Sequence, residues 1–263
     1  SPPQRLAWIS TWDVRCGIAE YSRFLLDTWP VEEQAITVLR DGRTPVPEQQ
    51  VGVNRVSTMP TWSPGNSHSL PSVVDAWSQL KPNALVIQHQ PGLIHWNGLK
   101  FLVDAAMDRS IPCTVVLHNV QDLLIQEDPA SVVAALARIP HLLVHTQRDR
   151  QQLLRLGLHD NLTVLPHGAI ADAVSTVAAR KCLIRHTDVR IGAYGFMLPH
   201  KGFRNLVEAV TQLQPLWPDI RLKMVNAVYP TEESESYLKS CQAAATALPS
   251  AQVEWHTDYL ANE

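Results

Sequence analysis

The sequence lacks the features that mark membrane, secreted and nucleic-acid-binding proteins. No apolar run in its 263 residues approaches the length of a membrane span, and the N-terminus lacks a signal peptide's basic start and apolar middle. Lysine and arginine (22) do not outnumber aspartate and glutamate (25), so no basic excess suggests a nucleic-acid partner. We therefore expect a cytoplasmic protein that binds no nucleic acid.

The sequence also lacks the spacings typical of zinc, redox and dinucleotide sites. Its four cysteines, at positions 16, 113, 182 and 241, are far apart, and reduced thiols explain them most simply. The 11 histidines are dispersed over predicted strand ends and loops, without HExxH spacing. No GxGxxG follows a predicted strand, which argues against a dehydrogenase. We expect no metal site.

What the sequence does contain is a regular alternation of strand-like and helix-like runs. Strands are predicted at residues 6–10, 35–39, 51–56, 84–88, 113–118, 142–146 and 162–165, with helices at 18–29, 73–80, 99–107, 130–138 and 149–156. Because these strands are apolar on both faces and alternate with helices, they predict an α/β fold with a parallel sheet covered by helices.

The pattern divides the chain into two domains. Residues 1–168 form the first, residues 169–187 have no clear period and read as a connection, and residues 188–263 restart the alternation. The second part contains strands at 189–194, 220–226 and 252–256 and helices at 205–214 and 234–247. A sheet of only three parallel strands would leave a long apolar edge. We therefore expect a missing C-terminal segment or a partner chain.

The stretch RIGAYGFMLPHKGFRNLVEA, residues 190–209, predicts a strand, a tight turn and a helix N-terminus. That arrangement presents free backbone N–H groups and a positive dipole end to an anion. Lys201, at the mouth of the turn, would add a charge suited to phosphate. The alternative is an ordinary loop with a solvated lysine.

Four stretches in order carry a resemblance to a known family. They are CGIAEYSRFLL after the first strand, VVLHN at 115–119, LLVHTQRDRQQLLRLGLHDNLTVLPHG at 142–168 and IGAYGFMLPHKGFRNLVEAV at 191–210. Together they resemble the retaining, nucleotide-sugar-dependent glycosyltransferases of family 4, and within it the bacterial branch with many mannosyltransferases. The resemblance implies the GT-B fold, with two Rossmann-like domains and parallel sheets, the second incomplete here.

The resemblance implies a donor site in the first domain. Gly17 matches the glycine of the first strand-to-helix loop, where the backbone comes close to the donor phosphate and the reacting sugar and where a Cβ would clash. A plain turn glycine is the alternative. Glu20, in the first turn of the next helix, is a weaker candidate, since a carboxylate there also complements the helix dipole.

His118 matches the family's histidine that hydrogen-bonds the donor sugar, and it is the catalytic candidate. A buried histidine satisfied by backbone is the alternative. Asn119 and Asp122 follow it and are candidate acceptor contacts. His145 reads as structural, with one face to the cleft at most, and His167 is a further candidate for approaching the donor.

Lys201 matches the family's diphosphate-binding lysine, with Gly202 after it and Gly195 at the end of the preceding strand. The family usually has an arginine where this chain has Phe196. His200, next to the lysine, would partly replace that charge if it were protonated.

A second departure is the absence of the family's pair of glutamates separated by seven residues. That pair would lie beyond residues 253–256. Glu232, Glu233 and Glu235 lie upstream on a predicted helix surface and are not that pair. The resemblance therefore implies a chain truncated in its C-terminal domain.

The implied function is transfer of a hexose, with mannose favoured, from a nucleotide-diphosphate sugar to a glycan or lipid-linked acceptor with retention of configuration. GDP-mannose is the favoured donor, no cofactor is implied, and peripheral association with the inner face of the membrane is expected. The alternatives are an inactive GT-B module acting as a binding or assembly subunit, and a sugar-nucleotide epimerase or phosphorylase. Trp62 and Trp96 are either acceptor-stacking residues or core residues.

Overall fold

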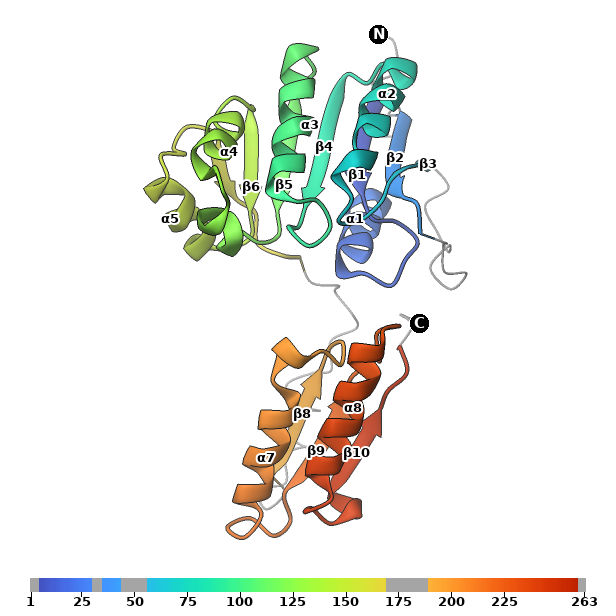
Figure 1. Cartoon of the computed structure of the whole chain (residues 1–263), viewed down its shortest axis with the longest axis vertical. Helices are drawn as coiled ribbons and strands as arrows, with labels where there is room; N and C mark the ends of the chain where they lie inside the picture. The colour runs from blue at the N-terminus through green and yellow to red at the C-terminus, as the bar shows by residue number, and fades with distance from the viewer. Residues whose placement is uncertain (1–4, 30–34, 44–55, 169–188, 260–263) are drawn as a thin grey trace. The chain divides into compact units, whose positions relative to one another are not determined.

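The structure is a computed structural model that describes residues 5–29, 35–43, 56–168 and 189–259 (Figure 1). It divides into two compact units, Ser1–Ala169 and Ile170–Glu263, each with its own core. The predicted connection at residues 169–187 lies outside the described residues. The predicted domain limits therefore stay a prediction.

The first unit is built on a seven-stranded sheet in the order β3-β2-β1-β4-β5-β6-β7, and every neighbouring pair is parallel. This order reverses direction between β1 and β4, and such a switch point opens a crevice at the carboxyl ends of the strands. The strands are β1 (Arg5–Ser10), β2 (Ala35–Asp41), β3 (Val56–Trp62), β4 (Ala84–His89), β5 (Cys113–Leu117), β6 (His141–Val144) and β7 (Leu162–Val164).

Helices cover both faces of this sheet because its side chains alternate between two apolar clusters. Ala7 and Ile9 belong to the larger cluster, together with apolar residues of α2 (Pro71–Leu80), α3 (Trp96–Asp108), α4 (Pro129–Leu136) and α5 (Gln147–Arg155). Leu6 and Trp8 belong to the other cluster, with Leu26 of α1 (Gly17–Asp27).

A buried serine fixes α1 on the sheet. Ser22 lies within hydrogen-bond distance of Ser10 Oγ (2.7 Å) and accepts a bond from Trp8 Nε1 (3.1 Å). Because buried polar groups have to be paired, these bonds define where α1 lies on β1. They thereby set the position of Tyr21, the neighbouring residue on the helix.

In the second unit, the described residues form three parallel strands in the order β10-β9-β8, as the sequence predicts for this part of the chain. Leu222 and Met224 of β9 are buried against Val207 of α7, whereas Tyr194 of β8 is 85% exposed. The elements are β8 (Arg190–Tyr194), β9 (Arg221–Val225) and β10 (Val253–His256), with helices α7 (Phe203–Leu213) and α8 (Glu232–Ala245).

Two element predictions need correction. The weak strand predicted at residues 51–56 overlaps the described part only at Val56, and β3 instead runs to Trp62. Its Pro60 made the run look like loop, but β3 is an edge strand, where proline is tolerated because one side of the strand needs no N–H donor. Helix α7 starts at Phe203 and not near residue 205, since the buried Phe203 ring anchors its first turn.

The two tryptophans considered as acceptor contacts are core residues. Trp62 is 3% exposed and Trp96 is 1% exposed, so neither offers a ring face to a ligand. Among the helices in the described part of the chain, none has the length and apolar content needed to cross a membrane.

Candidate functional site

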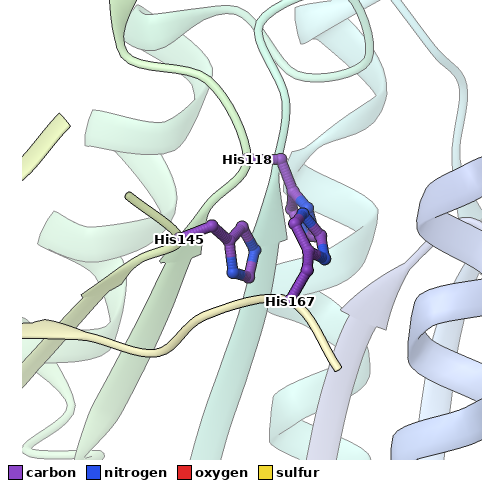
Figure 2. A group of neighbouring side chains, drawn as sticks. All are labelled: His118, His145 and His167. Atoms are coloured by element: carbon purple, nitrogen blue, oxygen red, sulfur yellow. The ribbon is translucent and has the colours of Figure 1, made fainter. Parts of the chain in front are cut away.

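The strongest candidate site lies at the carboxyl edge of the first sheet, where three histidines come together. His118 directly follows β5, His145 directly follows β6, and His167 lies on the segment after β7 (Figure 2). His118 and His145 are 27 positions apart in the sequence, and His145 and His167 are 22 positions apart. They lie side by side because β5, β6 and β7 are adjacent parallel strands. The expectation that the histidines are dispersed is therefore wrong for these three.

The three imidazole rings pack tightly against one another and against one tyrosine. The rings of His145 and His167 are stacked with centroids 3.7 Å apart and planes at 25°. His118 lies 4.7 Å from His145 and 5.8 Å from His167. Tyr21 of α1 meets all three rings edge-on, at 5.0 to 5.3 Å. These four residues are called the histidine cluster below.

Hydrogen bonds orient two of the rings. His118 Nε2 lies 2.8 Å from Gln88 Oε1, near the end of β4. His145 Nδ1 lies 2.8 Å from the Leu165 carbonyl, which can only accept, so Nδ1 carries the proton. The other nitrogen of His145, Nε2, is buried and has no hydrogen-bond partner among the described residues.

The surroundings keep at least two of the rings uncharged at neutral pH. Burial first, and then the neighbouring His145, His167 and His89, together lower the pKa of His118 to about 3. The pKa of His167 is lowered by burial and by His145. Burial also raises the pKa of Tyr21, which keeps its phenol protonated. The cluster therefore offers neutral nitrogen lone pairs that accept hydrogen bonds from a ligand hydroxyl.

Gly17 is the first residue of α1, on the same edge of the sheet. A Cβ built on it would meet no atom of the chain within 4 Å, and its φ is not in the left-handed region. The described fold therefore does not itself require a glycine there. Glu20, in the first turn of α1, forms an ion pair with Arg23, whose Nη2 lies 2.8 Å from Glu20 Oε2. The Glu20 carboxylate thus has a partner within the helix.

Asn119 and Asp122 follow His118 and have local contacts. Asn119 Oδ1 accepts a hydrogen bond from the Gln121 backbone N–H at 2.8 Å, where the short 3₁₀ helix Gln121–Ile125 begins. Asp122 is exposed on that helix. Both residues are on the carboxyl edge of the sheet, where the three histidines lie. Of the two, Asp122 is the one whose side chain is exposed to solvent.

The second unit has its own candidate site at the carboxyl edge of its sheet. A pocket of about 270 Å³ opens there, and the Phe196 ring in its wall contacts Tyr229 edge-on at 5.3 Å and stacks on Tyr259 at 6.1 Å. The buried Asn226 side chain donates to the Gly195 carbonyl, and its Oδ1 has no partner among the described residues. The pocket is lined by Tyr194, Gly195, Phe196, Val225, Ala227, Asp258 and Tyr259.

Lys201 and His200 are exposed on the turn Pro199–Lys201, a few residues after Phe196 of this pocket. Within the described ranges the Lys201 ammonium makes no ion pair. Gly195 (φ +122°) and Gly202 (φ +70°) both have left-handed backbones, so here the turn itself requires glycine. The N–H of Arg204, in the first turn of α7, is already bonded to the Tyr237 hydroxyl at 3.0 Å.

The candidate residues thus form two sets, one in each unit. Gly17, Glu20, His118, Asn119, Asp122 and His167 belong to the first unit, and Gly195, His200, Lys201 and Gly202 belong to the second. Sequence reasoning missed Tyr21 and Gln88 and treated His145 as structural. A signal for two of them was present, because Gln88 and His145 are polar residues at the ends of otherwise apolar strands.

No protein-family model matches the sequence, and no curated protein matches it. The structure is similar to sucrose-phosphate synthase from Thermosynechococcus elongatus, with 14% identity, a TM-score of 0.70 and coverage of 97% of this chain and 71% of that one. It is similar to Anabaena HepE in complex with UDP, at 13% identity, a TM-score of 0.65 and coverage of 97% and 70%.

A third similar structure is UDP-GlcNAc 2-epimerase from Neisseria meningitidis bound to UDP-GlcNAc, at 10% identity, a TM-score of 0.60 and coverage of 98% of this chain and 73% of that one. At these identities the likeness establishes the fold. Both units of the chain have the parallel sheet and covering helices of a Rossmann-like domain, and the predicted GT-B fold is confirmed.

Proposed function

We propose that the protein is a retaining glycosyltransferase that moves a hexose from a nucleotide-diphosphate sugar to a glycan or lipid-linked acceptor. The observation that carries the proposal is the histidine cluster, whose neutral lone pairs lie on the same sheet edge as Gly17 at the start of α1. The UDP and UDP-GlcNAc ligands of two similar structures support a nucleotide-sugar as the ligand class.

The diphosphate would bind to cationic and dipolar groups. The exposed Lys201 ammonium has no competing carboxylate in the described ranges, which leaves it available to a phosphate oxygen. Gly17 opens the N-terminus of α1, where free N–H groups and the positive end of the helix dipole favour an anion. His200 and the turn glycines Gly195 and Gly202 complete the proposed phosphate contacts.

His118 would accept a hydrogen bond from a hydroxyl of the donor sugar. It is positioned for this by Gln88, which holds Nε2, and the other ring nitrogen has no hydrogen bond to any residue that the structure describes. A neutral ring is needed, because an imidazolium would donate to the hydroxyl and not accept from it. The low pKa of His118, about 3, supplies that state at neutral pH. His167 is the exposed histidine of the cluster, and Asn119, Asp122 and Glu20 are the remaining candidate contacts.

The proposed chemistry is displacement on one face of the sugar. The bond from the anomeric carbon to the diphosphate oxygen breaks, and the bond from that carbon to the acceptor oxygen forms on the same face. The acceptor proton passes to the departing diphosphate, so no protein nucleophile is needed. The protein's part is to position both substrates and stabilise the charge that develops on the diphosphate.

The finer assignments rest on the family resemblance. We propose a family 4 enzyme of the mannosyltransferase branch, with GDP-mannose as donor, no cofactor, and a cytoplasmic location at the inner face of the membrane. The acceptor would be a growing surface or lipid-linked glycan.

The test is transfer by a Lys201→Ala variant, with the exposed Lys239→Ala as matched control. Removing the Lys201 charge should lower the rate of transfer by about 10² or more, since the lost contact stabilises the leaving diphosphate. Lys239→Ala should retain the wild-type rate. Wild-type turnover in Lys201→Ala would remove that residue from the mechanism. Sugar-nucleotide conversion without any acceptor would point instead to an epimerase.

A further inference from the structure

The nitrogen Nε2 of His145 has a chemical need that the described protein atoms do not meet. His145 is 7% exposed, its Nδ1 donates to the Leu165 carbonyl, and its Nε2 therefore holds a lone pair with no donor facing it. A buried acceptor without a partner costs on the order of 1–3 kcal/mol. Such a cost is recovered if the lone pair binds a ligand.

The His145 ring lies beside two further imidazoles, those of His118 and His167. One ring nitrogen each of His118, His145 and His167 lie within 4.8 Å of one another (Figure 2). With Gln88 Oε1 accepting from His118 Nε2, the free nitrogen of His118 is Nδ1. Neutral imidazoles cannot satisfy one another when each presents an acceptor. A cation is the ligand that satisfies all of them together.

The hydrogen bonds on the far side of two rings are those that metal-ligating histidines make. Such a histidine usually donates its other N–H to a backbone carbonyl or a side-chain oxygen, which fixes the tautomer and the ring orientation. His145 has this bond to Leu165, and His118 has it to Gln88. These contacts follow from the fold and are present without any ion.

We propose that His118, His145 and His167 form a binding site for one divalent transition-metal ion, of the class that includes Zn²⁺, Co²⁺ and Ni²⁺. Imidazole nitrogen suits these ions, whereas Mg²⁺ and Ca²⁺ need carboxylate or carbonyl oxygens, which the set lacks. Three protein ligands leave one coordination position for water or another ligand. The site goes beyond the proposed transferase function and stands against the expectation of no metal site.

The geometry fits after one side chain moves. Zn–N bonds of about 2.0–2.1 Å place the ligand nitrogens of a tetrahedral site about 3.3 Å apart. The three nitrogens lie within 4.8 Å of one another, so they would have to move slightly closer together to bind the ion. His167 has to supply it, because its ring is stacked on His145 and two parallel rings do not aim at one point. His167 is exposed, so its rotation disturbs no core packing.

A bound ion would occupy the lone pair that His118 offers to the donor sugar in the proposed function. Zn²⁺ is therefore expected to compete with the nucleotide-sugar. The metal site does not depend on that function, because binding of the ion alone is measured without any nucleotide. Failure of one proposal leaves the other standing.

The experiment is equilibrium dialysis of the full chain against Zn²⁺ alone, with Co²⁺ absorption as a report on ligand geometry. We expect one Zn²⁺ per chain, and binding at least tenfold weaker in His118→Gln, His145→Gln and His167→Gln. The exposed His159→Gln is the matched control and should bind as the wild type does. Gln88→Leu tests the supporting hydrogen bond and should weaken binding about 10- to 100-fold.

The contradicting results are equally clear. Absence of stoichiometric Zn²⁺ binding by the wild type would overturn the proposal, as would equal binding by His159→Gln and His167→Gln. Circular dichroism checks that each variant folds. Should His145→Gln unfold, His167→Gln still decides the matter because that side chain is exposed.

Discussion

At the scale of single residues, Gly195 and Gly17 each follow a strand, but the physical reason for a glycine differs between the two positions. Gly195 has φ +122°, a backbone conformation that a side chain strains, whereas Gly17 has an ordinary φ and open space around its missing Cβ. The fold accounts for Gly195. For Gly17 the proposed function supplies the reason, namely a ligand that would approach the helix start through this space.

Paired alanine substitutions separate these reasons. Gly195→Ala should lower the free energy of unfolding of the second unit by about 1–3 kcal/mol, because alanine is strained at this φ. Gly17→Ala should leave unfolding unchanged or slightly favour folding, since alanine is a better helix former, yet it should weaken nucleotide-sugar binding. Chemical denaturation and ligand titration of both variants measure this. Equal ligand binding by Gly17→Ala and wild type would contradict the assigned approach.

The residue scale also shows what the sequence could predict about the site. His118 could be found because it follows an apolar strand in a matching motif. Its convergence with His145 and His167 depends on which strands are neighbours, and strand order is a long-range property that periodicity does not contain. Tyr21 was missed for a related reason, since its contact with the cluster depends on how Ser22 fixes α1 on β1.

At the scale of elements, the start of α8 holds the loop that carries the second candidate site. Ser234 is fully buried, and its hydroxyl donates to the Met197 carbonyl at 2.6 Å and accepts from the Tyr229 N–H at 3.0 Å. Met197 lies between Phe196 of the pocket and the turn with Lys201. The helix start therefore fixes where this loop leaves the sheet.

Ser234→Ala should destabilise the second unit by about 1–3 kcal/mol, because it leaves two buried backbone groups without a partner. Ser236→Ala, an exposed serine of the same helix, is the control and should change little. Hydrogen exchange measured by mass spectrometry should speed up in β8, β9 and β10 of Ser234→Ala and stay unchanged in β1 to β7. Unchanged protection of β8 to β10 would show that these bonds do not hold the loop.

The elements themselves were largely predictable from sequence. Runs such as 84–88 and 113–118 are apolar on both faces, and this property alone indicates buried parallel strands. The misplaced strand is the one at the sheet edge, β3, since an edge strand tolerates Pro60 and loses the apolar pattern on its open side. The local sequence thus indicates well whether a strand is buried, but it indicates poorly whether a strand lies at the edge of the sheet.

At the scale of the whole molecule, the chain has two sheets with separate apolar cores, and each carries a candidate site at the carboxyl ends of its strands. The first site offers neutral imidazoles and an open helix start, and the second offers an exposed ammonium and an aromatic pocket. The proposed function assigns a sugar hydroxyl to the imidazoles of the first unit and a phosphate to the ammonium of the second.

Isothermal titration of the wild-type protein with nucleotide-diphosphate sugars, with GDP-mannose first and UDP-glucose alongside, is the decisive test of the proposed function. We expect saturable binding of one nucleotide-sugar per chain, with GDP-mannose tightest and with the affinity lowered at least tenfold in Lys201→Ala. Absence of saturable binding for every nucleotide-sugar, in protein shown to be folded, would contradict it.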